Sequence, residues 1–544
     1  EKIAILNFEL FKEKENININ GFISEKLNDN HKIDFNNVDI SYFNMLLKDA
    51  GIELGGRLNE EINLKNLMDS PSITCDLIVD SLQINNHFLG RANIDISNTL
   101  SLDEFFVDIS VLYKGKNNEQ NMPLSVKGYI YPESLVNNLN LNLSMKDFNL
   151  GIIENYLSSF SSDFKGYLSG DNISVRGTFK QPNIQGKLYC RKGEINIDMI
   201  NTKYYFSDTI KLDNNIFILN NFSLLDINKN PLTLNGKITH KDFQEFNIDL
   251  TAKANNVRVL NTNPSTDQMY FGSAFTSATA VLKGDLNFLK IDVNAKTEKG
   301  TKLTIPISSK TSVTQGSFIQ FVEKPLPGED KKFIPIKNKA LNDKAMEYKI
   351  DVNLQVNPDA EISLPLNFTN LRGDLTASGE GELKIEIDDK GKFNMYGGVD
   401  ISSGVFNMVL MNLVEKNFII QKGGRIEWNG NPALGVIDAE AIYKTKASLA
   451  PILDIGKYSK PVDVQSVIML SGSMMNPKPK FDIRLPNTDQ QTIDQLFMTI
   501  DKNDEKQMLE QTVSLLVMKQ FYVSTGGVSD SFRDTDLTSS AFEV

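Results

Sequence analysis

The sequence predicts an all-β protein: one elongated, curved sheet of antiparallel, meandering strands, followed by short amphipathic helices at the C-terminal end. Three observations predict this fold class. Apolar and polar residues alternate along most of the chain, turn-forming residues separate the alternating runs, and helical segments do not alternate with the strands. Parallel strands need long crossovers, usually helices, so the lack of such segments favours antiparallel pairing.

The alternation has a period of two residues. The clearest alternating apolar residues are Leu139, Leu141, Leu143 and Met145; Phe246, Ile248 and Leu250; Leu383, Ile385 and Ile387; and Phe481, Ile483 and Leu485. Successive side chains of a strand point to opposite faces, so each run has one apolar face and one polar face. Turn residues such as Asp389-Lys-Gly391 lie between the runs and indicate hairpins.

Two short phrases recur along the chain. Pro123-Leu-Ser-Val-Lys-Gly128 returns as Pro231-Leu-Thr-Leu-Asn-Gly236, and Gly177-Thr-Phe-Lys-Gln-Pro182 returns as Gly472-Ser-Met-Met-Asn-Pro477. In strands, glycine marks a bend or a close backbone approach, and proline lies where no ladder donor is required. Loose repeats of this kind indicate a sheet that grows by adding strands.

The end of the chain changes to helical periodicity. Apolar residues recur there at intervals of three and four: Ile493, Leu496, Phe497 and Ile500, and then Leu509, Val513, Leu516 and Val517. This pattern predicts two short amphipathic helices. They could cap the sheet, bind a partner protein or touch a membrane. The few lysines nearby (Lys502, Lys506 and Lys519) are a weak polar face for a membrane surface. We therefore expect capping or partner binding by these eight apolar residues.

The chain divides by pattern into four segments. Residues 1–255 and 256–345 are predicted to form the first two parts of the sheet, and residues 323–345, rich in Pro, Gly and charge, an exposed excursion. Residues 346–486 continue the sheet, and residues 487–544 form the helical end.

Composition excludes several classes of protein. The 544 residues carry a net charge of -12 without a clustered basic stripe, which argues against binding to the phosphate backbone of nucleic acid. His31, His87 and His240 lie far apart, and Cys75 and Cys190 match neither a metal-ligand spacing nor a disulfide framework. We expect no metal site and no cofactor.

Motifs of catalysis are missing from the sequence. Asp501, Asn503 and Glu505 resemble the start of a calcium-binding loop, but the loop glycine is absent and Thr512 occupies the last ligand position. A helix boundary explains these residues better. The sequence has no Gly-x-Ser-x-Gly and no phosphate-binding loop, so we expect no catalytic residue and no enzymatic activity.

A sheet that is apolar on one face over hundreds of residues needs something to cover that face. A sheet folded lengthwise into a trough leaves a continuous apolar groove for acyl chains. Each methylene that enters water costs about 0.8 kcal/mol, so a diacyl lipid with roughly 30 methylenes faces a barrier on the order of 20 kcal/mol. The candidate groove residues are Ile173, Val175, Phe179, Ile218, Ile248, Leu250, Leu383, Ile385, Ile387 and Ile483.

The C-terminal part of the chain resembles a known family. The phrase Gly423-Gly-Arg-Ile-Glu-Trp-Asn-Gly430, the stretch from Met469 to Pro486 and the helical segment after it are similar to the C-terminal region of TamB-type proteins, which belong to the AsmA-like superfamily. Tyr270-Phe-Gly272 through Pro306 resembles the approach to that region. The resemblance covers residues 166–535, whereas residues 1–165 share only the general character of the family's sequences and none of these phrases.

The resemblance implies a U-shaped sheet, the β-taco, in the periplasm of diderm bacteria. It implies an inner-membrane anchor at the N-terminal end and a final C-terminal stretch, both expected to be missing from this chain. It also implies phospholipid movement between the inner and outer membranes, and docking on an outer-membrane barrel of the BamA/TamA type.

Two other functions fit the sequence. A scaffold for outer-membrane protein assembly would bind strands through its sheet edge. A secreted β-solenoid that binds polysaccharide would carry aromatic ladders on an exposed face, whereas the aromatics here alternate with aliphatic residues. The single tryptophan, Trp428, is expected to pack in the core or at an edge rather than to contact a lipid headgroup or a partner.

Overall fold

The computed structural model describes most of the chain. The described residues are 3–24, 29–47, 53–66, 71–98, 102–114, 120–157, 160–241, 244–264, 270–306, 347–367, 371–410, 414–453 and 460–522. The excursion predicted at residues 323–345 lies outside them.

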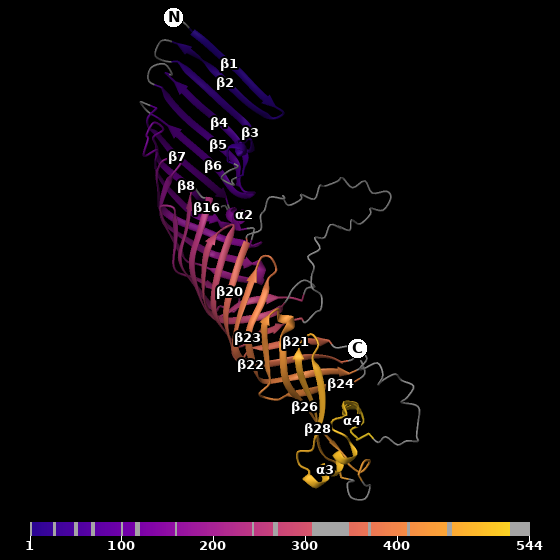
Figure 1. Cartoon of the computed structure of the whole chain (residues 1–544). Helices are drawn as coiled ribbons and strands as arrows, with labels where there is room; N and C mark the ends of the chain where they lie inside the picture. The colour runs from indigo at the N-terminus through magenta and orange to yellow at the C-terminus, as the bar shows by residue number, and fades with distance from the viewer. Residues whose placement is uncertain are drawn as a thin grey trace, which may run out of the picture. The chain divides into compact units, whose positions relative to one another are not determined.

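The strands form one long, largely antiparallel, meandering sheet, and two short helices follow it, which confirms the predicted fold class (Figure 1). The first strands are β1 (Ile3–Lys12), β2 (Glu15–Ser24), β3 (Asn30–Asp39), β4 (Leu54–Lys65), β5 (Ser72–Ile84), β6 (His87–Ser97), β7 (Phe105–Lys114), β8 (Gln120–Ile130), β9 (Leu139–Asn149), β10 (Phe164–Gly177), β11 (Pro182–Ile197), β12 (Thr202–Phe206), β13 (Thr209–Asp213), β14 (Ile216–Leu225) and β15 (Pro231–Lys241). They are followed by β16 (Gln244–Thr262), β17 (Phe271–Asp285), β18 (Phe288–Thr297), β19 (Lys302–Thr304), β20 (Glu347–Val356), β21 (Glu361–Asn367), β22 (Leu371–Asp388), β23 (Phe393–Leu410), β24 (Val414–Ile420), β25 (Arg425–Gly430), β26 (Val436–Ala447), β27 (Val462–Ser473) and β28 (Lys478–Arg484).

Short helical segments interrupt or end the sheet. They are η1 (Ile40–Phe43), α1 (Asn44–Leu47), η3 (Leu150–Ile153), α2 (Glu154–Leu157), η4 (Asp198–Ile200), η5 (Pro432–Leu434), α3 (Gln490–Thr499) and α4 (Glu505–Val517). The parallel pairing of β19 with β21 departs from the antiparallel rule. A long strand also pairs with two shorter ones in succession, as β23 does with β24 and β25.

The chain divides into two compact units, which are described separately here. The N-terminal unit comprises Glu1–Val257, Thr279–Ile291 and Leu341–Tyr348, and the C-terminal unit comprises Arg258–Ala278, Asp292–Ala340 and Lys349–Val544. The N-terminal unit contains β1 to β15 whole. The C-terminal unit contains β21 to β28 and the helices α3 and α4.

Bulges with a left-handed residue bend many strands of the N-terminal unit. In β3 the register shifts between Phe35 and Val38, and Asn37 within this bulge has a φ of +55°. At four such residues the backbone N–H donates to a polar side chain from the next strand or just after it: Asn37 to Asn59 (2.8 Å), Asp147 to Ser169 (3.1 Å), Lys192 to Ser207 (3.1 Å) and Asn221 to Asn235 (2.7 Å). Bulges bend a strand and increase its twist, so these Asn and Ser residues stabilise the curvature.

The repeated glycines are required where strands approach closely. Gly128 in β8 and Gly236 in β15 have φ angles of +153° and +134°, and a Cβ on either would lie 2.1 or 2.2 Å from a carbonyl oxygen of the next strand. The second repeat has a different role. Gly177 and Gly472, with φ of +92° and +95°, begin the hairpin turns between β10 and β11 and between β27 and β28.

The two predicted helices are present at the C-terminal end of the C-terminal unit. The side chain of Asp489 accepts the backbone N–H of Thr492 at the start of α3, and that of Asp504 accepts those of Lys506 and Gln507 at the start of α4. The acidic residues after Ile500 thus form a helix boundary.

Candidate functional site

The register of the N-terminal unit places apolar side chains on one face of the sheet from β1 to β11. Directly paired residues of antiparallel strands point to the same face. One transverse line of paired residues, which we call the apolar row, runs through Phe8, Ile19, Ile33, Ile62, Cys75, Ile96, Val107, Gly128, Leu141, Val175 and Ile184. Gly128 contributes no side chain, and each of the other members is hydrophobic.

The adjacent line of residues, one position along each strand, points to the opposite face. This polar row runs through Glu9, Asn18, Asp34, Glu61, Asp76, Asp95, Asp108, Lys127, Asn142, Ser174 and Gln185. A shift of one residue in register would exchange the two faces, so the contrast between the rows fixes the register.

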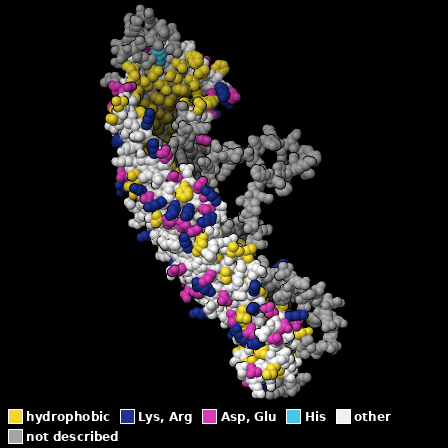
Figure 2. Space-filling view, viewed as in Figure 1, with side chains coloured by type: hydrophobic (Ala, Val, Ile, Leu, Met, Phe, Trp, Pro, Cys, Tyr) yellow, Lys and Arg dark blue, Asp and Glu magenta, His cyan; other side chains and the backbone are white. Residues whose placement is uncertain are grey.

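The apolar row is only partly covered by the protein itself. Two members of the row, Cys75 and Val107, are buried. The other members with side chains are half-buried, except Phe8, which is 49% exposed. Figure 2 shows a hollow lined by hydrophobic side chains over the first strands of this unit. A hydrophobic surface that faces a hollow leaves room for an apolar guest.

The charges of the polar row are partly compensated by ion pairs. Lys32 contacts both Asp34 and Glu61, and Lys127 contacts Asp108 at 2.7 Å. Asp95 lies in register between Asp76 and Asp108, and partial burial together with these two carboxylates raises its pKa. These groups form a solvated outer face.

Both cysteines are buried thiols in the N-terminal unit. Burial raises the pKa of Cys75 to about 11 and that of Cys190 to about 12. A thiol with such a pKa is a weak nucleophile at neutral pH, so Cys75 contributes to the apolar row as a small hydrophobic group.

In the N-terminal unit, the structure places four of the six predicted groove residues on the apolar face. Val175 is a member of the apolar row. Ile173 shares its strand and its face but is 0% exposed, packed in a core with Leu188 and Leu212. Ile248 and Leu250 pair with Ile238 and Gly236 of β15, on the face of the buried Leu219.

Two predicted groove residues are corrected by the structure. Ile218 pairs with Lys211 and Lys237 and therefore lies on the polar face, because its neighbours Phe217 and Leu219 occupy the apolar one. Phe179 lies in the turn after β10 rather than in a strand, and it is 54% exposed.

The other four predicted groove residues belong to the C-terminal unit. Leu383, Ile385 and Ile387 of β22 pair with the apolar face of β20, and Ile483 lies on β28. Leu383 and Ile483 are 5% and 0% exposed, within hydrophobic cores that the unit forms from its own side chains. The apolar face is thus filled here. In the N-terminal unit the apolar row is mostly half-buried, although other residues of the same face, such as Val79 and Val111, form a core of their own.

Most of the predicted partner-binding residues pack against the sheet of the C-terminal unit. Leu496, Ile500 and Leu516 are buried, and Ile493, Phe497 and Val513 are partly buried against the same cores. Leu509 is half-buried, and Val517 is 55% exposed. The most exposed apolar side chain of this region is that of Met498, which has no apolar residue three or four positions away and therefore lies outside the predicted helical pattern.

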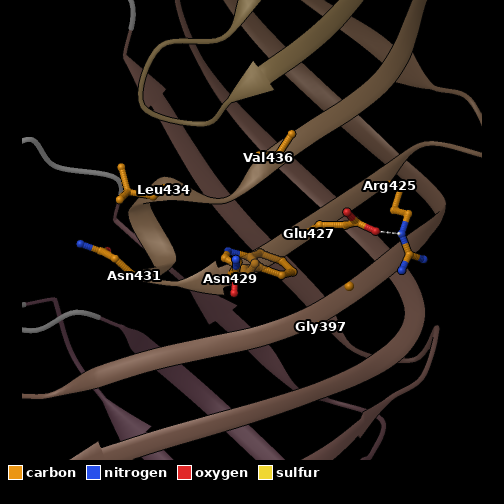
Figure 3. Close-up of a pocket in the computed structure, with 9 residues that line it drawn as sticks. Gly397, Arg425, Glu427, Asn429, Asn431, Leu434 and Val436 are labelled. Carbon is orange, nitrogen blue, oxygen red and sulfur yellow. Dashed lines mark hydrogen bonds and ion pairs between the residues drawn. The ribbon is translucent and has the colours of Figure 1, made fainter.

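A small pocket of about 360 Å³ opens on the Gly423–Gly430 phrase (Figure 3). Its lining includes Arg425, Glu427, Asn429, Leu434 and Val436. The guanidinium group of Arg425 is already paired with the carboxylates of Glu427 (2.7 Å) and Asp400 (2.6 Å), so it has little capacity to bind an anion.

Trp428 beside this pocket packs into the core, as the sequence suggests. It is 4% exposed, and its indole N–H donates to the carbonyl oxygen of Pro432 at 3.1 Å. Gly435 leaves space for the ring, because a Cβ there would lie 2.7 Å from the indole nitrogen.

The comparison with protein families identifies the C-terminal part of the chain. The model of the TamB C-terminal domain matches residues 220–542. The chain belongs to this family. A search of the curated proteins finds no match. TamB proteins are periplasmic proteins of the cell envelope, generally non-enzymatic, and are implicated in outer-membrane biogenesis and lipid transport.

None of the described helices is long and apolar enough to cross a membrane. Among the same residues, His, Cys, Asp and Glu side chains form no group of three that would hold a metal ion.

Proposed function

We propose that this chain is a periplasmic lipid-transfer protein that holds the acyl chains of phospholipids on the apolar face of its sheet. The observation that carries the proposal is the apolar row of β1 to β11, which is half-buried and unbroken by charge, beside a row of polar residues on the other face. Membership of the TamB family supports the same function.

Energetics explain why such a face suits this cargo. Moving a diacyl lipid through water exposes roughly 30 methylenes at about 0.8 kcal/mol each, a barrier on the order of 20 kcal/mol. A continuous strip of Ile, Leu, Phe and Val removes most of that cost at every position along the strip. Acyl chains then slide from strand to strand without a catalytic group.

The cellular setting is part of the proposal. The protein carries phospholipid between the inner and outer membranes and is held at the inner membrane. Its C-terminal unit docks on an outer-membrane barrel of the BamA/TamA type. Family membership supports this setting.

The test is mass spectrometry of the organic extract of gently purified protein, with a matched pair of variants. Ile96 belongs to the apolar row, and its neighbour Ser97 points to the other face. Ile96→Arg places a charge among the acyl chains and is expected to remove most of the bound phospholipid, whereas Ser97→Arg is expected to leave it.

Two results would overturn the proposal. One is a folded wild-type protein that carries no lipid, and the other is equal loss of lipid in both variants. The first result would favour the scaffold for outer-membrane protein assembly, which binds strands through the sheet edge. Circular dichroism of each variant establishes that the sheet is intact.

A further inference from the structure

The hairpin of α3 and α4 covers the apolar face of the last strands in the C-terminal unit. Helix α4 contacts β24, β26, β27 and β28. Leu515 and Leu516 on the helix are 0% and 1% exposed, and Val464, Ile468 and Ile483 on the strands are equally buried. These residues belong to the hydrophobic cores that the helix and the sheet share.

Three hydroxyl groups are buried in this part of the unit without a hydrogen-bond partner among the described residues: that of Thr488, just before α3, and those of two fully buried residues, Ser466 and Thr512. Ser466 of β27 is 0% exposed, and it points to the same face as Tyr443 and Ile483, with which it pairs. Thr512 of α4, also 0% exposed, lies one turn from Leu515 and Leu516. A buried hydroxyl loses its hydrogen bonds to water and gains none in return, so each weakens the closed arrangement.

The hairpin is held together by its own contacts. The ammonium group of Lys502 lies over the ring of Phe497, and the side chain of Gln507 accepts the backbone N–H of Asp501. Lys502 also forms a solvent-exposed ion pair with Asp482 of β28 (3.4 Å), which breaks when the hairpin lifts. Gln511 exchanges two hydrogen bonds with the backbone of Tyr522. Such internal contacts allow the hairpin to move as one body about the loop that follows β28.

We propose that the α3–α4 hairpin is a displaceable lid over an acyl-chain site in the C-terminal unit. It is closed in this structure. When it lifts, Ser466 and Thr512 regain water, and the face formed by Val464, Ile468 and Ile483 becomes free for acyl chains. The inference rests on the proposed function, because it assigns the same cargo to this face.

The hydroxyl groups provide the test. Thr512→Val keeps the shape of the side chain and removes the unpaired hydroxyl, so it is expected to hold the lid closed, and Ser466→Ala is expected to act in the same direction. Thr499→Val is the matched control, because Thr499 lies on the exposed side of α3.

The full chain is incubated with vesicles of phosphatidylethanolamine that contain a photoreactive diazirine in the acyl chain, and labelled peptides are identified by mass spectrometry. The wild type and Thr499→Val are expected to be labelled in β5–β6 and in β27–β28. In Thr512→Val, labelling of β27–β28 falls by about tenfold, the order of effect of removing one unpaired buried polar group. Labelling of β5–β6 does not change, and hydrogen exchange of α4 slows.

The outcomes separate the lid from the proposed function. Labelling of β5–β6 without labelling of β27–β28 in the wild type overturns the lid alone. Slower hydrogen exchange in α4 with unchanged labelling of β27–β28 also overturns it. Absence of label from both segments contradicts the lipid-transfer function itself.

Discussion

Asp95 lies in the polar row directly between two other carboxylates, those of Asp76 and Asp108. Because partial burial and these neighbours raise its pKa, the folded state binds a proton at Asp95 more tightly than the unfolded state does. Its contribution to the free energy of unfolding is therefore favourable at low pH and is lost as the pH rises through the folded pKa.

This linkage predicts the behaviour of Asp95→Asn. At pH 7 the substitution removes a repelled charge that is partly screened by solvent, so the melting temperature is expected to rise only slightly, by about 1 °C or less in a protein of this size. Below about pH 3.9, the ordinary value for an aspartate, the gain is expected to vanish. Calorimetric scans at both pH values check this, and an equal gain at both would contradict it.

Single residues also mark the limit of what alternation predicts. Ile173, Val175, Ile248 and Leu250 lie on the apolar face of their strands, as expected for apolar residues flanked by polar ones, and their contact with lipid stays a prediction. Ile218 was not, since residues 216–219 are all apolar and a continuous run does not show which side chains face inward. Phe179 was misplaced because a hairpin turn after Gly177 interrupts the alternation.

At the scale of the strand, glycine is needed where two backbones meet. Gly128 of β8 pairs with Leu141, and a Cβ there would lie 2.1 Å from the carbonyl oxygen of Asn140. We expect Gly128→Ala to lower the free energy of unfolding by roughly 1–3 kcal/mol, as strained backbone positions do.

The matched control for this prediction is Gly55→Ala in β4. A Cβ at Gly55 would meet only the side chain of Gln83, at an ordinary 3.6 Å, so the loss of stability there is expected to be small. Urea unfolding of both variants gives the comparison. Equal losses would show that the close approach at Gly128 does not constrain the residue.

The elements themselves were largely predictable. Period-two alternation indicated the strands, and helical spacing after residue 488 indicated α3 and α4, since both patterns follow from the need to bury one face. The bulges were not predicted, because an Asn or Ser within a strand does not reveal that it accepts an N–H from a left-handed residue of the neighbouring strand. These hydrogen bonds can be recognised only once the pairing register of the strands is known.

At the scale of the whole chain, the register and the family comparison support the function in different segments. The family match covers residues 220–542, whereas the apolar row lies between Phe8 and Ile184. Family membership therefore supports the setting of the protein, and pairing between strands supports the groove. The sequence indicated an apolar face along the chain, but which of its residues are buried in a core and which stay half-buried, as in the apolar row, depends on packing between distant residues.

Photocrosslinking along both rows tests the central claim most directly. A photoreactive phenylalanine is placed in the apolar row at Ile33, Ile96 or Val175 and, as matched controls, in the polar row at Asp34, Asp95 or Ser174. After irradiation in cells, the predicted result is a phospholipid adduct at each apolar-row position and at none of the polar-row positions. Adducts at equal frequency on both rows, or at neither, would contradict the claim that this face carries lipid.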